Sequence, residues 1–185
     1  MKPVVVVYLS WVLFLMACDR GEKVPAATER KPFSIEGAVQ QVTKSFPDGS
    51  VKSAVYLNEQ SQQKIAEVEF HANGQAKIDK RFVNDTLQGE SWCYYEDGKP
   101  WSLNTFKNGL NDGPYKTWHE NGQIYIQGQY EKGLKSGEWF TYFANGGLNT
   151  RGFYKNDEKV GIWNSYNLEG TMKREQDFGA GGNQE

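Results

Sequence analysis

Short apolar and polar runs alternate along most of the chain, and aromatic residues recur at fixed places within them. No stretch between about residues 34 and 178 shows the apolar spacing of three and four that predicts an amphipathic helix. The alternation breaks instead at Asp-Gly, Asn-Gly or Glu-Gly pairs, which favour tight turns. The glycines of these pairs follow one another in steps of 25, 24, 24, 24 and 24 residues. They are Gly49, Gly74, Gly98, Gly122, Gly146 and Gly170. A fixed period of this size predicts a repeat array.

A second glycine column runs out of phase with the first. Gly89, Gly113, Gly137 and Gly161 each stand nine residues before one of the turn glycines. Interpreted as a second turn in each unit, they leave two strands of roughly six to eight residues per repeat, which is a hairpin. Aromatic residues account for 14% of the chain and all hydrophobic residues together for 38%. This composition suits a thin β structure better than a thick aliphatic core. The sequence therefore predicts an all-β fold, a single-layer antiparallel sheet built from 24-residue hairpin repeats.

The predicted register decides which side chains share a face. A three-residue loop at each turn glycine places an aromatic residue opposite an apolar or proline residue. The expected pairs are Tyr94 with Pro100, Trp118 with Ile124, Tyr142 with Leu148, and Tyr166 with Met172. The same face should carry a continuous aromatic column of Phe82, Phe106, Tyr130, Tyr154 and Phe178. A slip of one residue would mix the two faces.

The opposite face is expected to mix aromatic and polar residues, and it is the candidate partner-binding surface. Its rings are Trp101, Tyr115, Tyr125, Trp139 and Trp163. The alternative is that these rings only stiffen exposed strands, because single apolar residues on a surface need no function.

The N-terminal residues have the pattern of a secretory leader. Met1-Lys2 is followed by the apolar run Pro3–Ala17, which is too short to span a bilayer comfortably. Leu15-Met16-Ala17-Cys18 resembles the lipobox of bacterial lipoproteins, and this resemblance implies cleavage before Cys18 and lipid attachment to it. An ordinary cleaved signal or an uncleaved anchor is the alternative.

These signals divide the chain into four parts. Residues 1–17 are the expected signal peptide, and residues 18–33 are the lipidated cysteine with a flexible tether. Residues 34–178 form the repeat array, in which residues 34–69 are a degenerate first unit. Residues 179–185 are a glycine-rich tail, expected to be disordered.

Charge and chemistry exclude several classes of function. The formal net charge is −2 and no Lys/Arg run occurs, so nucleic acid is not an expected partner. His71 and His119 are two units apart, about 19 Å at the usual strand spacing, and cannot share a metal ion within one chain. Cys93 is expected in mid-strand, facing Trp101. No acid, base and nucleophile converge in the pattern, so we expect no enzyme activity, no cofactor and no metal site.

Two segments carry a family resemblance. Gly113–Gly122 and Gly137–Gly147 resemble the variant MORN repeat, and especially bacterial proteins of the YwqK antitoxin family. The resemblance covers roughly residues 70–178, and it implies an elongated antiparallel β-meander that contacts proteins or membranes.

The expected function is accordingly a non-enzymatic lipoprotein of the bacterial cell envelope. It is anchored through Cys18, and its sheet binds a protein partner, with an antitoxin or immunity role as the sharper version. The second hypothesis is a cell-wall or glycan-binding module in which evenly spaced rings stack on sugars. A third is an array that provides envelope bulk without a dedicated ligand.

Overall fold

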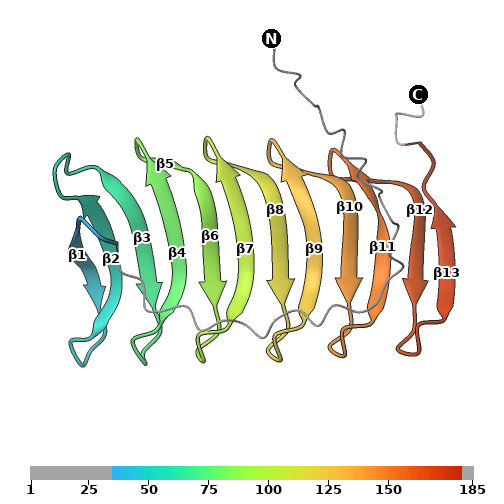
Figure 1. Ribbon diagram of the computed structural model, residues 1–185, viewed down its shortest axis with the longest axis horizontal. Coiled ribbons are helices and arrows are strands. Elements are labelled where there is room, and N and C mark those ends of the chain that lie inside the picture. Colours follow the sequence, from blue (N-terminus) through green and yellow to red (C-terminus); the bar gives the residue numbers. More distant parts are fainter. Residues whose placement is uncertain (1–34, 181–185) are drawn as a thin grey trace, which may run out of the picture.

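The computed structural model describes residues 35–180, and within them the chain forms one open antiparallel sheet without helices (Figure 1). The sheet has thirteen strands, and each strand of its main path pairs with the next one along the chain. Figure 1 shows the strands side by side in a single row, with the turns along two opposite edges. The predicted all-β, single-layer meander is confirmed.

The strand bounds are as follows. The first six are β1 (Ala38–Ser45), β2 (Val51–Asn58), β3 (Lys64–Phe70), β4 (Ala76–Val83), β5 (Thr86–Leu87) and β6 (Gly89–Tyr94). The others are β7 (Pro100–Lys107), β8 (Leu110–Trp118), β9 (Ile124–Glu131), β10 (Leu134–Tyr142), β11 (Leu148–Lys155), β12 (Glu158–Tyr166) and β13 (Met172–Asp177). Only the short β5 lies off the main path, where it pairs with β4.

The first glycine column lies at the predicted turns, along one edge of the sheet. At the β8–β9 turn, His119 N donates to Gln123 O over 2.8 Å, and Gly122 N donates to His119 O over 2.8 Å. Gly122 has a φ of 83°, a backbone conformation that L side chains rarely adopt. The same pair of backbone bonds recurs at the other turns of this edge, so the 24-residue period is the period of the hairpins.

The second glycine column does not lie at turns, which corrects the sequence interpretation. From β4 onward the reversals at the other edge are two-residue turns with positive φ at both positions, as in Asn156-Asp157 (52° and 69°) and Lys132-Gly133 (50° and 92°). Gly113, Gly137 and Gly161 instead lie inside β8, β10 and β12, and Gly89 begins β6. Moving the turns away from this column lengthens β8, β10 and β12 to nine residues each.

A β-bulge next to every turn of the first edge changes the faces. The predicted pairs at the base of the turns are all present, for example Trp118 with Ile124. The next pair along is Thr117 with Ile126, so Tyr125 has no partner. One extra residue on a strand shifts the pairing beyond it by one residue. Side chains that would otherwise lie on opposite faces of the sheet then lie on the same face. The expected contact between Cys93 and Trp101 is therefore wrong, because Cys93 pairs with Ser102.

Within residues 35–180 the buried apolar residues are few: a cluster in the first strands, with Leu103 on β7 and Trp139 on β10 beyond it. Ala54, Tyr56, Ala66 and Val68 form a small core in the first strands. Farther along, Trp139 on β10 is 5% exposed. A single-layer sheet buries side chains mainly against their neighbours on the same face, so the rings carry most of the packing in the later repeats.

Candidate binding surfaces

Six rings on one face interlock into what we call the aromatic ladder. Its members are Tyr115, Tyr130, Trp139, Tyr154, Trp163 and Phe178. Successive rings meet edge to face at centroid distances of 5.5, 5.3, 5.6, 5.0 and 6.4 Å. This geometry is favoured because the positive edge of one ring meets the negative face of the next. The sequence predicts Tyr130, Tyr154 and Phe178 on one face, and Tyr115, Trp139 and Trp163 on the other. In the structure all six lie on one face, because the bulges shift the pairing by one residue.

Glycines provide the space into which the tryptophans fold. A Cβ atom at Gly128 would overlap carbons of the Trp139 ring, and one at Gly152 would overlap the Trp163 ring. Each ring therefore lies flat against bare backbone on a neighbouring strand. The prediction that Trp139 belongs to an exposed contact surface is wrong, because this packing leaves it buried.

Two lysines lie over the ladder. Lys135 Nζ is 4.9 Å from the centroid of Trp139 and 5.0 Å from that of Tyr154. Lys159 Nζ is 4.3 Å from the centroid of Trp163 and 5.3 Å from that of Phe178. These cation–π contacts cover part of the Trp139, Tyr154, Trp163 and Phe178 rings.

Burial changes the ionisation of the ladder tyrosines. It raises the pKa of the Tyr115, Tyr130 and Tyr154 phenols above the ordinary value, because the charged phenolate is poorly solvated there. The nearby Asp157 carboxylate adds to the rise in pKa at Tyr130 and Tyr154.

The extra residues of the bulges form a second regular feature, which we call the bulge column. It consists of Lys52, Lys77, Trp101, Tyr125, Asn149 and Lys173, each skipped by the register at one turn. Trp101 is 51% exposed and Tyr125 is 44% exposed. By strand alternation they share the face of Leu103 and Gln127, opposite the ladder. The five rings predicted as one surface therefore divide between the two faces.

The strands β6 and β8, which neighbour β7 and β9, carry further rings. On β6, Trp92 stacks with Trp118 at a centroid distance of 5.7 Å and with Tyr94 at 6.4 Å. The Tyr125 ring lies 4.7 Å from that of His119. Trp92, Tyr94 and Trp118 form one stack and Tyr125 contacts His119, while Trp101 and Tyr125 are the exposed rings; we call these six residues together the bulge-face group (Trp92, Tyr94, Trp101, Trp118, Tyr125 and His119).

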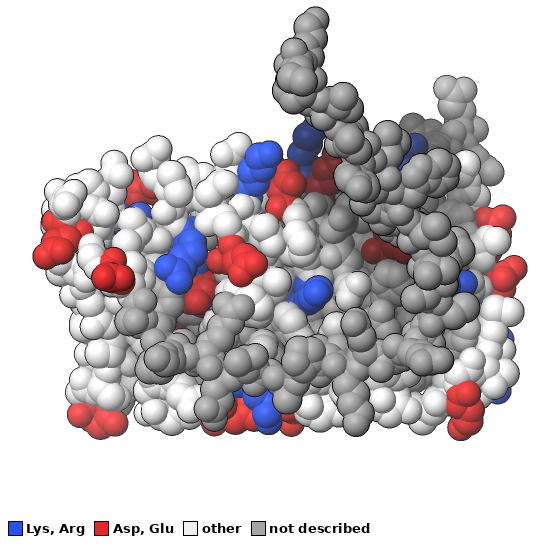
Figure 2. All heavy atoms as spheres, in the orientation of Figure 1, with Lys and Arg blue, Asp and Glu red and all other residues white. Residues whose placement is uncertain are grey.

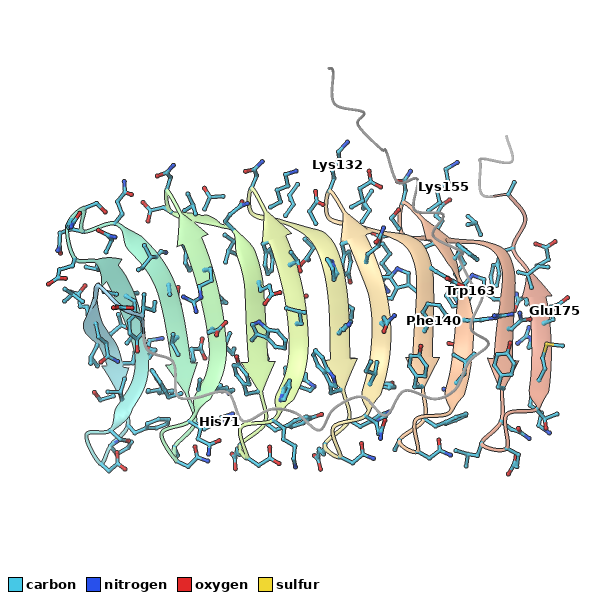
Figure 3. The ribbon with its side chains drawn as sticks, in the orientation of Figure 1. His71, Lys132, Phe140, Lys155, Trp163 and Glu175 are labelled. Carbon is cyan, nitrogen blue, oxygen red and sulfur yellow. The ribbon has the colours of Figure 1, made fainter. Side chains whose placement is uncertain are left out.

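The histidines have a structural role that the sequence interpretation missed. Figure 3 shows His71 at the edge of the glycine turns and Lys132 at the other edge. His71 Nε2 lies 3.0 Å from Tyr94 O, and His119 Nε2 lies 3.0 Å from Tyr142 O. At the equivalent place Tyr95 Oη donates to Trp118 O over 2.7 Å. A polar ring three residues before the turn glycine, present at Gly74, Gly98 and Gly122, is the signal that could have revealed this link between hairpins.

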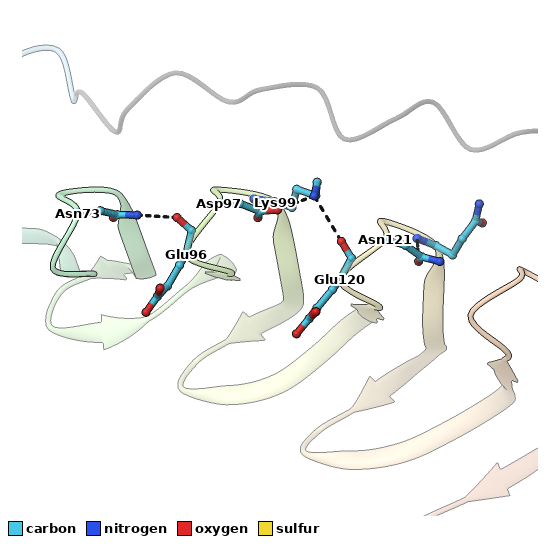
Figure 4. Close-up of polar contacts among 7 residues, drawn as sticks. Asn73, Glu96, Asp97, Lys99, Glu120 and Asn121 are labelled. Atoms are coloured by element: carbon cyan, nitrogen blue, oxygen red, sulfur yellow. Dashed lines mark hydrogen bonds and ion pairs between the residues drawn. The ribbon is translucent and has the colours of Figure 1, made fainter.

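A second set of bonds joins neighbouring turns at the same edge (Figure 4). Asn73 Nδ2 donates to Glu96 O over 2.7 Å. Asn121 Nδ2 makes the equivalent bond to Ala144 O over 2.6 Å. Asp97 has no donor at this position; Lys99 pairs with it and reaches Glu120 O over 3.5 Å. The Lys99 hydrogen bond lowers the pKa of Asp97. We call this set the turn-edge bonds.

Charged and metal-ligating side chains are dispersed among residues 35–180. Lysine, arginine and acidic side chains are interspersed over the face that Figure 2 shows. No group of three or more His, Cys, Asp or Glu residues in this part of the chain could hold a metal ion. Cys93 is a free, half-buried thiol.

Some predictions concern residues beyond those the structure describes. Cys18, the signal peptide, the tether and the last five residues all lie outside residues 35–180. Between residues 35 and 180, no helix is long and apolar enough to cross a membrane.

The chain is similar to parts of several solved structures. Among solved structures it is similar to the Glycosylation Associate Protein (Gap123) complex from Streptococcus agalactiae, with a TM-score of 0.39, 14% identity, 62% of this chain covered and 22% of that one. It is also similar to TarM, with a TM-score of 0.27, 12% identity, 68% of this chain covered and 21% of that one. The match thus spans about a fifth of each of these proteins.

No curated protein matches the chain. Residues 87–108, 111–132 and 135–156 match the MORN repeat variant in three consecutive copies. The matched copies run from β5 to the end of β11, and each begins just after a tight turn of the second edge or, for the first copy, within β5. Over these segments the hairpins of the array are similar to the MORN repeat variant.

Proposed function

We propose that the protein is a non-enzymatic, membrane-anchored lipoprotein that binds a protein partner through the bulge-face group. The observation that carries this proposal is the contrast between the two faces. Trp139 is packed on glycine and capped by a lysine, whereas Trp101 and Tyr125 are 51% and 44% exposed. The variant MORN repeats support a repeat-based binding module in general.

The chemistry of the surface favours a protein as ligand. Tryptophan and tyrosine are enriched among the residues that dominate protein interfaces, where they are surrounded by polar residues. Here two exposed rings have Lys77 and Asn149 next to them in the same column. The charges of the chain nearly cancel, which gives no electrostatic reason to prefer a polyanion.

The partner test uses the full chain in its own membrane. The Trp101→Ala/Tyr125→Ala double variant should lose a defined crosslinked partner that the unmodified chain captures and mass spectrometry identifies. Phe153→Ala is the matched control, because Phe153 is also exposed, at 48%, but lies far along the array on β11. Equal capture by the double variant would refute this surface.

The anchor is tested separately. Cys18→Ala should move the protein from the membrane fraction to the soluble or uncleaved form, since the lipid would attach at that thiol. A membrane-bound Cys18→Ala variant with a cleaved leader would contradict lipid anchoring at Cys18. The position of the protein in the bacterial cell envelope rests on this part of the proposal.

The antitoxin or immunity role is the sharper version. It requires a toxin whose lethality the full chain suppresses, and suppression should depend on Trp101 and Tyr125. Co-expression with the products of neighbouring genes is the direct assay. If binding does not change the activity of the partner, the antitoxin role is refuted and the protein acts as a general adaptor.

A glycan ligand is the second candidate, and one observation favours it. Trp101 and Tyr125 lie on β7 and β9, two strands apart, which is about 9.6 Å at 4.8 Å per strand and suits two sugar rings along one chain. Sedimentation of the full-length protein with purified peptidoglycan tests this candidate. Retention that falls in the double variant supports it, and retention that is unchanged opposes it.

A further inference from the structure

Three Asn-Gly pairs occupy the same turn in different repeats. Asn73-Gly74, Asn121-Gly122 and Asn145-Gly146 all lie at the first edge of the sheet. In an Asn-Gly sequence the backbone nitrogen of glycine can attack the Asn Cγ atom, because glycine has no side chain to block the approach. The new C–N bond expels the side-chain nitrogen as ammonia, and water then opens the cyclic imide to aspartate or isoaspartate.

The attacking nitrogen is held in the same way in all three turns. Gly74 N donates to His71 O over 2.9 Å, Gly122 N to His119 O over 2.8 Å, and Gly146 N to Phe143 O over 2.9 Å. The φ value of each of these glycines is 83°. The backbone therefore gives no reason for the three sites to react at different rates.

The side-chain oxygens are also held alike. Asn73 Oδ1 accepts from Gln75 N over 3.0 Å, and Asn121 Oδ1 accepts from Gln123 N over 3.1 Å. Asn145 Oδ1 accepts from Gly147 N over 2.9 Å. The Cγ atoms thus start from equivalent positions.

The three sites differ at the leaving nitrogen. Nδ2 of Asn73 and of Asn121 is tied to the carbonyl oxygen of the next hairpin, at 2.7 and 2.6 Å. Asn145 makes no such bond to the β12–β13 turn within the described residues. The tied amides must break a hydrogen bond before Cγ can rotate towards the glycine nitrogen.

We propose that Asn145 is a site of spontaneous deamidation in the folded protein and that the turn-edge bonds protect Asn73 and Asn121. Losing a hydrogen bond costs about 1 kcal/mol, so the protected sites should react about fivefold more slowly. Asp97-Gly98 shows that an acidic residue fits this turn, here paired with Lys99. The fourth pair, Asn108-Gly109, lies in a tight turn of the other edge and is not a matched comparison.

The experiment follows the purified full-length protein in mildly alkaline buffer. Peptide mapping by mass spectrometry, with chromatographic separation of isoaspartate, gives one rate for each of the three sites. Asn145 should deamidate about fivefold faster than Asn73 and Asn121, whose rates should agree with each other. Equal rates at the three sites in the folded protein would overturn the proposal.

The same measurement in concentrated urea is the control for sequence effects. Asn145 is followed by Gly-Gly, whereas Asn73 and Asn121 are followed by Gly-Gln. Once the chain is unfolded, the advantage of Asn145 should disappear because the bonds between hairpins are lost. An advantage of the same size in urea would assign the effect to local sequence and refute protection by the fold.

Discussion

The Trp139 ring lies against the bare backbone of Gly128, in a space that a single methyl group would fill. The same relationship recurs one repeat later between Trp163 and Gly152. Both tryptophans are on strands that neighbour the glycine's strand, so each contact joins adjacent strands of the sheet. The glycines inside β9 and β11 are therefore packing positions.

Gly128→Ala should destabilise the array. The added Cβ atom would overlap the Trp139 ring and force it to move, and overpacking of this kind costs about 1–3 kcal/mol. Urea unfolding of the full-length protein measures the loss. Gln129→Ala is the control, because Gln129 is exposed on the other face of the same strand and its change should stay within about 0.5 kcal/mol. Equal effects of the two changes would contradict the packing argument.

Two of the three tryptophans of the predicted contact surface, Trp101 and Trp139, should behave oppositely. Trp139→Ala removes a buried ring and should lower the free energy of unfolding by about 3–5 kcal/mol. Trp101→Ala removes an exposed ring, and its effect should stay within about 0.5 kcal/mol. Thermal or urea unfolding compares the two variants. A large loss of stability in Trp101→Ala would mean that the bulge column is structural.

The predictable part of this fold is the part that short-range sequence controls. Asn-Gly and Asp-Gly pairs constrain the backbone locally, so the turns of the first edge and the pairs beside them, such as Trp118 with Ile124, are confirmed. The bulge residue has no such signature, since Lys77, Trp101 and Asn149 all occupy the skipped position. Only the pairing of both strands fixes it, and it decides which rings face one another. For this reason the sequence identified the rings and misassigned their faces.

The bonds between hairpins were also beyond the sequence interpretation. They connect residues 23 positions apart, and a donor such as His119 finds its acceptor only when two turns lie side by side. The local sequence around a polar ring before a turn glycine does not identify which carbonyl oxygen it will contact. The bond at Tyr95 allows a direct test of what such a contact contributes.

Tyr95→Phe should cost about 1 kcal/mol of stability. The change removes the hydroxyl that donates to Trp118 O and leaves a partly buried carbonyl oxygen without that donor. Tyr166→Phe is the matched control, because no hydrogen bond of its hydroxyl is found in the described part of the chain. The difference in urea midpoint between the two variants isolates the bond, and identical midpoints would show that the bond contributes nothing.

Alkaline pH should weaken the aromatic ladder. Burial raises the pKa of Tyr115, Tyr130 and Tyr154, so the folded state holds the phenol protons more tightly than the unfolded state does. The stabilising contribution is complete below the unfolded pKa of about 10 and is lost as pH rises through the folded pKa. Unfolding free energy should therefore be level below about pH 9 and fall above about pH 10. Replacing Tyr115 by Phe should reduce the slope; an unchanged slope in every ladder Tyr→Phe variant would contradict this origin.

Two arrangements supply the donor to the next hairpin: an asparagine amide, or a lysine paired with an aspartate. We expect one to be able to replace the other. Asn121→Asp replaces the donor to Ala144 O by a carboxylate that repels it, which should cost about 1–3 kcal/mol. Asn145→Asp, which loses no bond between hairpins, should change stability by less than about 0.5 kcal/mol.

At the equivalent turn Asp97 is accommodated because Lys99, two residues later, pairs with it and reaches Glu120 O. Adding Gln123→Lys to Asn121→Asp reproduces that arrangement and should recover most of the loss. A double-mutant cycle measures the recovery, and purely additive effects would show that the Asp–Lys pair is not an alternative to the asparagine.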